Sequence, residues 1–355
     1  MGLLRVDRLR ELMRTTDISA FLVTNRYNLR YLTGFSGSAG AALITADAAF
    51  LLTDFRYVDQ ARSQAAEFDI IQRQGPMEEL IAELLSKEHA ENLAFEEETV
   101  TFKEYLELEA LVEQDLLPVS GLVETLREVK DTAEIKTIKK ACAIADAAFE
   151  HILTCIRPGM TERQIANELD FYMRSMGASG VSFETIVASG ERSALPHGVA
   201  TDKEIAVGEF VTLDFGCYYD GYVSDITRTI AIGEPSDQLK DIYQIVFDAQ
   251  QQVMSAARPG MTGKELDAVA RDYITQKGYG EAFGHTTGHG IGLEVHEGPH
   301  VSAISDVPLV ANNIITNEPG IYLSGIGGVR IEDDLLITEN GVESLTQSPK
   351  ELIIL

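Results

Sequence analysis

Apolar and polar positions follow two different rhythms along the first third of the chain. Short runs rich in apolar and β-branched residues, such as 18–23 and 41–45, are typical of strands. Between such runs lie stretches such as 77–87, where apolar residues recur every three or four positions and predict amphipathic helices. The repeated change between these two patterns predicts a small α/β domain.

A turn cluster at 118–121 interrupts this rhythm, and a long helical pattern follows from Thr132 to about Ile156. Its apolar residues recur at steps of three and four, which predicts one helix with a continuous buried stripe. The residues of this stripe are Ile135, Ile138, Cys142, Ala145, Phe149 and Ile152. We place the domain boundary at about residue 123, which gives an N-terminal domain over 1–123 and a second domain over 124–355.

The second domain contains an internal repeat. The pentapeptide Arg-Pro-Gly-Met-Thr occupies 157–161 and again 258–262. Each copy follows one helical pattern and precedes another, and two copies so far apart are too few for a solenoid. The repeat therefore predicts a pseudo-symmetric domain of two similar halves, with a site expected between them.

The composition indicates a globular protein and restricts its partners. A chain of 355 residues with 45% hydrophobic and 24% charged residues can bury a core in each of two domains. It carries 56 acidic against 29 basic residues, and its net charge of −27 repels phosphate backbones and anionic lipids. We therefore expect no nucleic-acid partner and no membrane partner. The acidic excess either serves solubility or includes metal ligands.

The three cysteines, Cys142, Cys155 and Cys217, form no CxxC pair. Their spacing predicts neither a disulfide framework nor a thiolate zinc site, so we expect small core residues. The first residues contain no long apolar run of the signal-peptide kind. Together these features predict a cytoplasmic protein.

Histidines are concentrated in the second domain. Five of the seven lie between residues 197 and 300, namely His197, His285, His289, His296 and His300. A lone histidine is usually an ordinary hydrogen-bonded polar residue, but five in one region indicate a shared site.

An Asp-Gly pair at 220–221, flanked by β-rich runs, predicts a hairpin. With a two-residue turn, Asp214 lies opposite Thr227, which makes Asp225 a diagonal neighbour of Asp214 on the same face. Two unpaired carboxylates in an apolar setting repel each other, so a positive group is expected between them. Either a salt bridge or a metal ion satisfies this requirement.

Two further carboxylates flank a glycine-rich turn. Glu318 and Glu332 lie symmetrically about Gly325, so a hairpin centred there places them opposite each other. Between the two acidic pairs lies 284–292, whose glycines argue against a helical zinc-protease motif with two histidines one turn apart. We therefore expect one histidine ligand, on a loop or a strand.

Four carboxylates bring four negative charges, which two divalent cations would neutralise. Sites rich in carboxylates with one imidazole suit Mn, Co, Fe or Zn. Two such ions about 3.5 to 4 Å apart can share a bridging water, lower its pKa and polarise a carbonyl group. The pattern therefore predicts a hydrolase with a dinuclear metal centre.

These motifs resemble those of a known family, the Xaa-Pro aminopeptidases and prolidases of peptidase family M24. This family is part of the creatinase and methionine aminopeptidase superfamily. The resemblance covers essentially the whole length, and its motifs occur in the family's order and spacing. They are Leu213-Asp214-Phe215-Gly216, Ser224-Asp225-Ile226-Thr227-Arg228-Thr229, Gly288-His289-Gly290-Ile291-Gly292, Glu318-Pro319-Gly320 and Ile331-Glu332-Asp333. The resemblance implies a creatinase-type N-terminal α/β domain followed by an α+β pseudo-twofold "pita-bread" catalytic domain.

The resemblance also implies a role for each candidate residue. Two divalent metal ions, with Mn favoured and Co, Zn or Fe as alternatives, would be held by Asp214, Asp225, His289, Glu318 and Glu332. The catalytic residues would be His197, His296 and Glu318, with Glu318 as the proton acceptor. The substrate-binding residues would be His285, His300 and Arg330, and Arg330 would also brace a carboxylate ligand. Phe183 would help line the proline pocket.

The implied function is metal-dependent hydrolysis of the Xaa-Pro bond in short peptides, with a homodimer as the expected assembly. A dipeptidase is favoured, but His300 and Arg192 stand where related prolidases often carry Arg and Asn. A neutral histidine grips a substrate carboxylate less firmly than a bidentate arginine, so an Xaa-Pro aminopeptidase acting on longer peptides stays open. Creatinase and methionine aminopeptidase are disfavoured, the first because the ligands are present and the second because of the N-terminal domain. An inactive peptide-binding module is a remote alternative.

Overall fold

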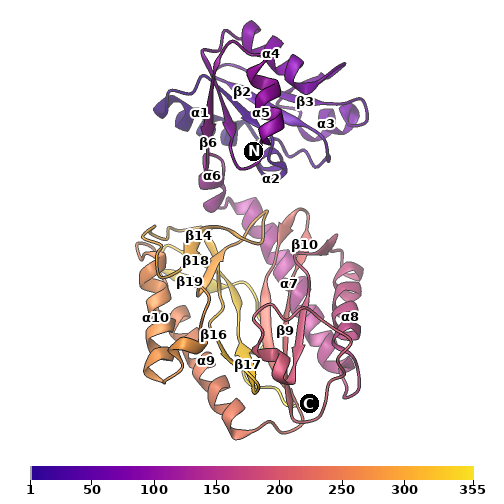
Figure 1. Cartoon of the computed structure of the whole chain (residues 1–355), viewed down its shortest axis with the longest axis vertical. Helices are drawn as coiled ribbons and strands as arrows, with labels where there is room; N and C mark the ends of the chain where they lie inside the picture. Colours follow the sequence, from indigo (N-terminus) through magenta and orange to yellow (C-terminus); the bar gives the residue numbers. More distant parts are fainter. Residues whose placement is uncertain (1) are drawn as a thin grey trace. The chain divides into compact units, whose positions relative to one another are not determined.

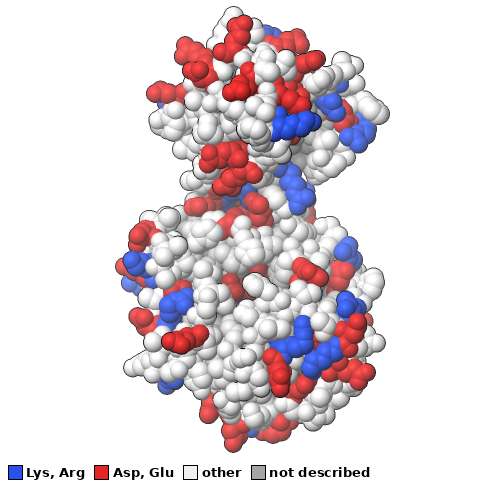
Figure 2. All heavy atoms as spheres, in the orientation of Figure 1, with Lys and Arg blue, Asp and Glu red and all other residues white. Residues whose placement is uncertain are grey.

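The computed structural model of the chain describes residues 2–355 (Figure 1). The described residues form two compact units, 2–127 and 128–355. The division lies within the short helix α6 (Glu124–Glu128), a few residues beyond the boundary expected at 123. Among the described residues, no helix is both long and apolar enough to cross a membrane. Acidic side chains are spread over the visible face of both units, with basic side chains among them (Figure 2).

The first unit is the α/β domain that the pattern predicted. Its sheet has the strand order β4-β3-β2-β1-β5-β6 and is antiparallel between β1, β2 and β3 and parallel elsewhere. The strands are β1 (Ala20–Val23), β2 (Ala41–Thr45), β3 (Ala49–Thr53), β4 (Asp69–Gln72), β5 (Asn92–Glu96) and β6 (Asp115–Val119). The helices before the boundary are α1 (Gly2–Thr15), α2 (Arg26–Thr33), α3 (Val58–Gln64), α4 (Met77–Lys87) and α5 (Phe102–Glu109).

The second unit contains two halves with the same order of elements, a long helix, a second helix and then antiparallel strands. The first half has α7 (Thr132–Cys155), α8 (Glu162–Ser175), β7 (Gly180–Val181), β8 (Ile186–Ser189), η1 (Gly190–Ala194), β9 (Glu209–Phe215), β10 (Cys217–Tyr219), β11 (Tyr222–Val223) and β12 (Ile226–Ile232). The second half has α9 (Asp237–Ala256), α10 (Gly263–Gln276), η2 (Gly280–Ala282), β13 (Gly288–Gly290), β14 (Glu297–Val301), β15 (Ile314–Asn317), β16 (Gly320–Leu323), β17 (Gly327–Arg330), β18 (Asp333–Thr338) and β19 (Gly341–Ser344). The helices lie on the outer sides and the strands between them (Figure 1), which confirms the α+β pseudo-symmetric fold.

The repeated pentapeptide forms the same helix-to-helix corner in both halves. Gly159 and Gly260 adopt φ angles of 85° and 88°, a left-handed backbone that favours glycine. Thr161 and Thr262 then cap α8 and α10, each with a reciprocal capping box. The repeat in sequence is therefore a repeat of backbone geometry.

Replacing Gly159 by Ala is expected to destabilise the protein by about 1–2 kcal/mol, the cost of a Cβ in left-handed backbone. An added Cβ at this position meets no atom within 4 Å, so the effect isolates backbone strain. Urea unfolding measures it. Gly284→Ala is the matched control, because its added Cβ is equally unhindered and its φ is not positive. Equal stability of the two variants would contradict the prediction.

Helix α7 buries the predicted stripe. Asp131 caps its N-terminus with a capping box, and the helix ends at Cys155, one residue before the predicted end. Ile135 is partly buried, and the other five predicted positions are fully buried in the domain core. The expectation of core cysteines is confirmed for Cys142 and Cys217, whereas Cys155 is only half-buried.

The first predicted hairpin has the predicted register. Asp220 and Gly221 have positive φ angles of 45° and 81°, as a two-residue hairpin turn of the primed type requires. Asp214 pairs with Thr227 between β9 and β12, as predicted. Asp225 lies in the short gap between β11 and β12. The turn at Asp220-Gly221 thus sets the strand register several residues away from the turn, including the pairing of Asp214 with Thr227.

The second predicted hairpin is also in register, but its strands divide between two sheets. Gly325, at the predicted centre, has a φ of 74°. Strand β16 pairs with β17, and β15 pairs with β18, in one continuous register around this centre. Glu318 and Glu332 occupy the breaks between the paired segments, at the position where the ladder passes from one sheet to the other.

Candidate metal centre

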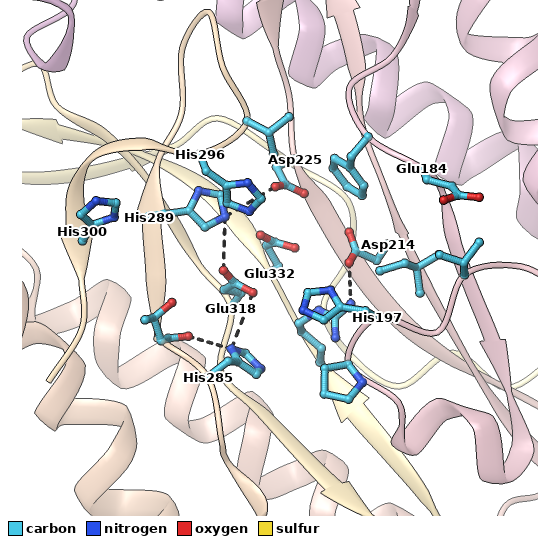
Figure 3. A pocket seen from close by; sticks show the side chains of 17 residues that line it. Glu184, His197, Asp214, Asp225, His285, His289, His296, His300, Glu318 and Glu332 are labelled. Atoms are coloured by element: carbon cyan, nitrogen blue, oxygen red, sulfur yellow. Dashed lines mark hydrogen bonds and ion pairs between the residues drawn. The ribbon is translucent and has the colours of Figure 1, made fainter. Parts of the chain in front are cut away.

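A cavity of about 470 Å³ opens in the second unit, and all ten residues predicted for the site line it (Figure 3). These residues are His197, Asp214, Asp225, His285, His289, His296, His300, Glu318, Arg330 and Glu332. Phe183 and Glu184 also line the cavity, whereas Arg192 lies outside its lining. The fold therefore brings one chemically coherent set of side chains into a common space.

Both halves of the domain supply the candidate metal ligands. Asp214 lies near the end of β9, and Asp225 directly precedes β12. From the other half, His289 is the central residue of β13, Glu318 follows β15 and Glu332 precedes β18. The placement of His289 on a strand agrees with the glycine pattern around it. A complete ligand set exists only when the two halves pack together.

The ligand atoms are close enough to share cations. His289 Nε2 lies 3.4 Å from Glu318 Oε1 and 3.9 Å from Asp225 Oδ2. Donor atoms of Asp225, His289 and Glu332 all lie within 4.8 Å of one another, and all three residues are buried. This spacing suits ligands around a metal ion better than isolated salt bridges.

The imidazole of His289 is oriented for ligation. Its Nδ1 lies 3.1 Å from the carbonyl oxygen of Gly290, an acceptor that requires the proton to be on Nδ1. The lone pair on Nε2 therefore faces the carboxylates. Burial, with the neighbouring His296, lowers the pKa of His289 to about 4. The ring is thus neutral near pH 7, as a metal ligand must be.

The carboxylates of the cavity repel one another in a buried environment. Burial raises the pKa of Glu318 to about 7, with repulsion from Asp214 adding to the effect and Arg330 opposing it. Burial and mutual repulsion raise the pKa values of Asp225 and Glu332 well above their usual range. One oxygen of Asp214 and one of Asp225 are buried without a hydrogen-bond partner. Such a donor set fits divalent cations, which would compensate the charges and use the free oxygens.

Arg330 connects the ligands from one side. Its guanidinium donates hydrogen bonds to the carboxylate of Asp214, to Thr227 Oγ1 at 3.1 Å and to the Tyr322 hydroxyl at 2.7 Å. Thr227 Oγ1 in turn donates to Glu332 Oε2 at 2.6 Å. The arginine is only 3% exposed, and these hydrogen bonds hold its guanidinium in one position. It therefore orients Asp214 directly and Glu332 through Thr227.

Tyr322 is a site residue that sequence reasoning missed. Its hydroxyl lies 2.8 Å from His285 Nε2, and burial raises its pKa to about 12. His285 Nδ1 lies 2.8 Å from the Thr286 carbonyl, so Nε2 is the acceptor of the tyrosine proton. The available signal was the strand period of two, which turns Tyr322 to the same side as Glu318.

Two family models match this chain. The model "Creatinase/Prolidase N-terminal domain" matches residues 5–129, and the model "Metallopeptidase family M24" matches residues 136–339, more than half of the chain. The chain belongs to metallopeptidase family M24. It is therefore a metal-dependent peptidase, and the predicted family, fold and enzyme class are confirmed.

Three relatives of this M24 metallopeptidase align with it over nearly their whole lengths. An Xaa-Pro dipeptidase of Pyrococcus horikoshii is 42% identical over 354 residues, with 98% of each chain covered. The solved structure of an Xaa-Pro dipeptidase from Bacillus anthracis has a TM-score of 0.99 at 52% identity and full coverage of both chains. An X-Pro aminopeptidase structure from Thermotoga maritima has a TM-score of 0.91 at 43% identity, covering 96% of this chain and 98% of its own.

Three further histidines of the M24 domain present their rings to the cavity. His197, His296 and His300 are exposed within its lining. The ring of His296 lies 4.3 Å from that of His289, centroid to centroid (Figure 3), and burial lowers its pKa. Hydrogen-bond donors of this kind are available to a bound substrate because neighbouring protein groups do not cover them.

Arg192 lies outside the cavity lining, so it is not positioned to contact a substrate. Its guanidinium donates to the buried carboxylate of Glu162 and, at 2.9 Å, to the carbonyl of Val199. These contacts brace the segment that carries His197. No local sequence pattern indicated a role for Glu162, because its partners come from distant positions in the chain.

Proposed function

We propose that this M24 metallopeptidase is an exopeptidase that hydrolyses the Xaa-Pro bond of short peptides, as an Xaa-Pro dipeptidase. The observation that carries the proposal is the convergence of four carboxylates and one neutral histidine in a cavity that also presents three exposed histidines. The Xaa-Pro dipeptidases of Pyrococcus horikoshii and Bacillus anthracis share this chain's full domain arrangement, which supports the same substrate class.

Two divalent cations, with Mn preferred and Co, Zn or Fe as alternatives, are assigned to one set of ligands. The set is Asp214, Asp225, His289, Glu318 and Glu332. When bound, the ions would lower the pKa of a water molecule and polarise the scissile carbonyl group. The buried, unpartnered oxygens of Asp214 and Asp225 support this assignment.

Glu318 is assigned the proton transfer. Its side chain is 15% exposed, against 6% for Asp225 and 11% for Asp214, so it borders the space that a substrate would occupy. One of its oxygens faces His289 and the other lies 3.9 Å from His285 Nδ1. From this position the carboxylate accepts a proton from the attacking water and delivers it to the leaving imino nitrogen of proline.

The remaining polar groups bind and orient the peptide. His197 and His296 donate hydrogen bonds to the carbonyl oxygen as negative charge develops on it. His285 and His300 are assigned to substrate binding, and Figure 3 shows His285 next to Glu318 and His300 beyond His289. For Arg330 we propose bracing of Asp214 as the principal role, because its donors are already used within the protein.

Removal of the metals is expected to abolish peptidase activity. The enzyme is treated with a chelator, dialysed, and reconstituted separately with Mn, Co, Zn and Fe, and metal content is measured beside turnover. We expect two ions per chain at full activity and the highest turnover with Mn. Full activity in the metal-free enzyme would contradict the ligand assignment, and bound metal without peptide cleavage would favour the inactive binding module.

Substrate length distinguishes the dipeptidase from the second candidate, an Xaa-Pro aminopeptidase. The observation that favours the alternative is His300, a weak group for gripping a dipeptide carboxylate. The kcat/KM values for Xaa-Pro and Xaa-Pro-Yaa-Zaa peptides are compared. A higher value for the dipeptide supports the proposed function, and a higher value for the tetrapeptide overturns it in favour of the aminopeptidase.

His300→Arg is expected to lower KM for the dipeptide about tenfold, because a hydrogen bond to a charged group contributes about 1.5 kcal/mol or more. The KM for the tetrapeptide, whose carboxylate lies further along the chain, should change less. His300→Lys is the matched control, since it adds the charge without the bidentate fork. An equal change in KM for both peptides would contradict a carboxylate contact at this position.

The homodimer and the cytoplasmic location stay predictions from the sequence and the family resemblance. Light scattering of the purified chain measures the first, and cell fractionation the second.

A further inference from the structure

A second group of potential metal ligands lies on α7 and α8. His151 and Cys155 are one helical turn apart on α7, and Glu168 belongs to α8, which packs beside α7 (Figure 1). His151 Nε2 is 3.5 Å from Cys155 Sγ and 2.6 Å from Glu168 Oε1. One donor atom from each residue lies within 4.8 Å of the other two, and all three residues are half-buried.

These distances are close to those of a tetrahedral zinc site. With Zn–S about 2.3 Å and Zn–N about 2.0–2.1 Å, a sulfur and a nitrogen ligand of one zinc ion lie about 3.6 Å apart. The 3.5 Å separation of Cys155 and His151 therefore needs almost no adjustment. The shorter contact of His151 with Glu168 is a hydrogen bond, and it would open by less than about 1 Å to admit the ion.

The imidazole is held in place before any metal binds. The ring of His151 stacks on that of Tyr172, with centroids 4.2 Å apart and planes 11° from parallel. Tyr172 lies one turn after Glu168 on α8, so the same helix face supplies a ligand and the support for another ligand. Pre-oriented ligands lose little conformational freedom on binding.

We propose that His151, Cys155 and Glu168 form a third cation site, separate from the catalytic centre and selective for Zn²⁺ over Mg²⁺, Ca²⁺ and Mn²⁺. A thiolate with an imidazole and a carboxylate is a donor set that favours Zn²⁺ among these ions. Three protein ligands leave a fourth position for water. The ion joins α7 to α8 and stabilises the folded domain, because it binds the folded state preferentially. Sequence spacing places His151 and Cys155 one helical turn apart but gives no sign of Glu168, which comes from another helix.

Cobalt tests this site independently of the catalytic centre. The metal-free full chain, kept reduced, is titrated with Co²⁺, and the near-ultraviolet charge-transfer absorption of a cobalt–thiolate bond is recorded. The proposed catalytic ligands include no sulfur, so this band reports a cysteine ligand alone. We expect the band in the wild-type protein, its loss in Cys155→Ser, and its suppression by Zn²⁺. Cys155→Ser retains the buried Cys142 and Cys217, so any absorption that remains in this variant measures their contribution to the band.

Two variants test the other ligands. His151→Gln and Glu168→Gln should each weaken Zn²⁺ binding about tenfold or more, since even outer-shell partners of ligands contribute about 10- to 100-fold. His89→Gln, at an exposed histidine of the first unit, is the matched control and should not change binding.

Two results would overturn the proposal. The first is a wild-type protein without the charge-transfer band, and the second is a band that persists in Cys155→Ser. Asp225→Asn, at a proposed catalytic ligand, is the control that should leave the band intact, because the catalytic ligand set contains no sulfur. The band is measured without peptide substrate, so the result is independent of the proposed Xaa-Pro specificity.

Discussion

Glu318→Gln is expected to lower kcat for Xaa-Pro cleavage by about 10²- to 10⁴-fold, the usual contribution of a general acid or base. The substitution keeps the size and one ligating oxygen of the side chain but removes its ability to accept a proton. The position of Glu318 between His289 and His285, at the boundary of the cavity, makes it the carboxylate placed to act on substrate. Steady-state kinetics with the metal content of each preparation measure the effect.

The metal content decides how a loss of turnover is interpreted. With two ions retained, the loss reports proton transfer, and with metal lost it reports ligation. Glu191→Gln is the control, because this glutamate is exposed and lies outside the cavity lining. Near wild-type turnover of Glu318→Gln with both ions bound would show that another group accepts the proton.

Arg228→Met is expected to destabilise the protein by about 3–5 kcal/mol, the cost of removing one partner of a buried ion pair. Arg228 and Asp333 are both essentially inaccessible to solvent, and the guanidinium lies 2.8 Å from the Asp333 carboxylate. It also donates to the carbonyls of Ser348 and Pro349, which ties the C-terminal segment to β12. Methionine fills similar space but donates no hydrogen bond to the two carbonyls, and it leaves the Asp333 carboxylate with fewer partners.

Guanidinium chloride unfolding monitored by circular dichroism measures this change. Arg163→Met is the matched control, because Arg163 pairs with Asp202 at the exposed surface, where solvent screens the interaction. Its unfolding midpoint should stay close to that of the wild type. Lys350 also contacts Asp333, and this second ion pair limits the loss of stability in Arg228→Met. Equal unfolding midpoints of the two variants would show that the Arg228 network makes no special contribution to stability.

Features that depend on local backbone preference were predictable from the sequence. The Asp-Gly pair at 220–221 requires positive φ angles, and it thereby fixed the register that sets Asp214 opposite Thr227. Gly325 did the same for the second hairpin. The long helix α7 followed from apolar spacing alone, since burial of one stripe selects a period of 3.6 residues.

Contacts between segments far apart in the chain were not predictable in this way. The hydrogen bonds of Arg330 to Asp214 and of Arg192 to Glu162 join residues on different elements. The cluster of His151, Cys155 and Glu168 depends on how α7 packs against α8, and the same packing leaves Cys155 half-buried. No local pattern encodes the distance between two packed surfaces.

The sequence by itself determined the two domains, the two hairpins and the candidate residues of the site, because periodicity, turn residues and residue type are properties of short segments. Only the tertiary structure decided that both hairpins open on one cavity, that His289 presents Nε2 to the carboxylates, and that Tyr322 and Arg330 support them. Burial raises the pKa of Glu318 to about 7, and burial exists only after distant segments have packed. The candidate metal centre is therefore a product of packing, since buried carboxylates that repel one another need compensating cations, whereas the same charges fully exposed to water would not.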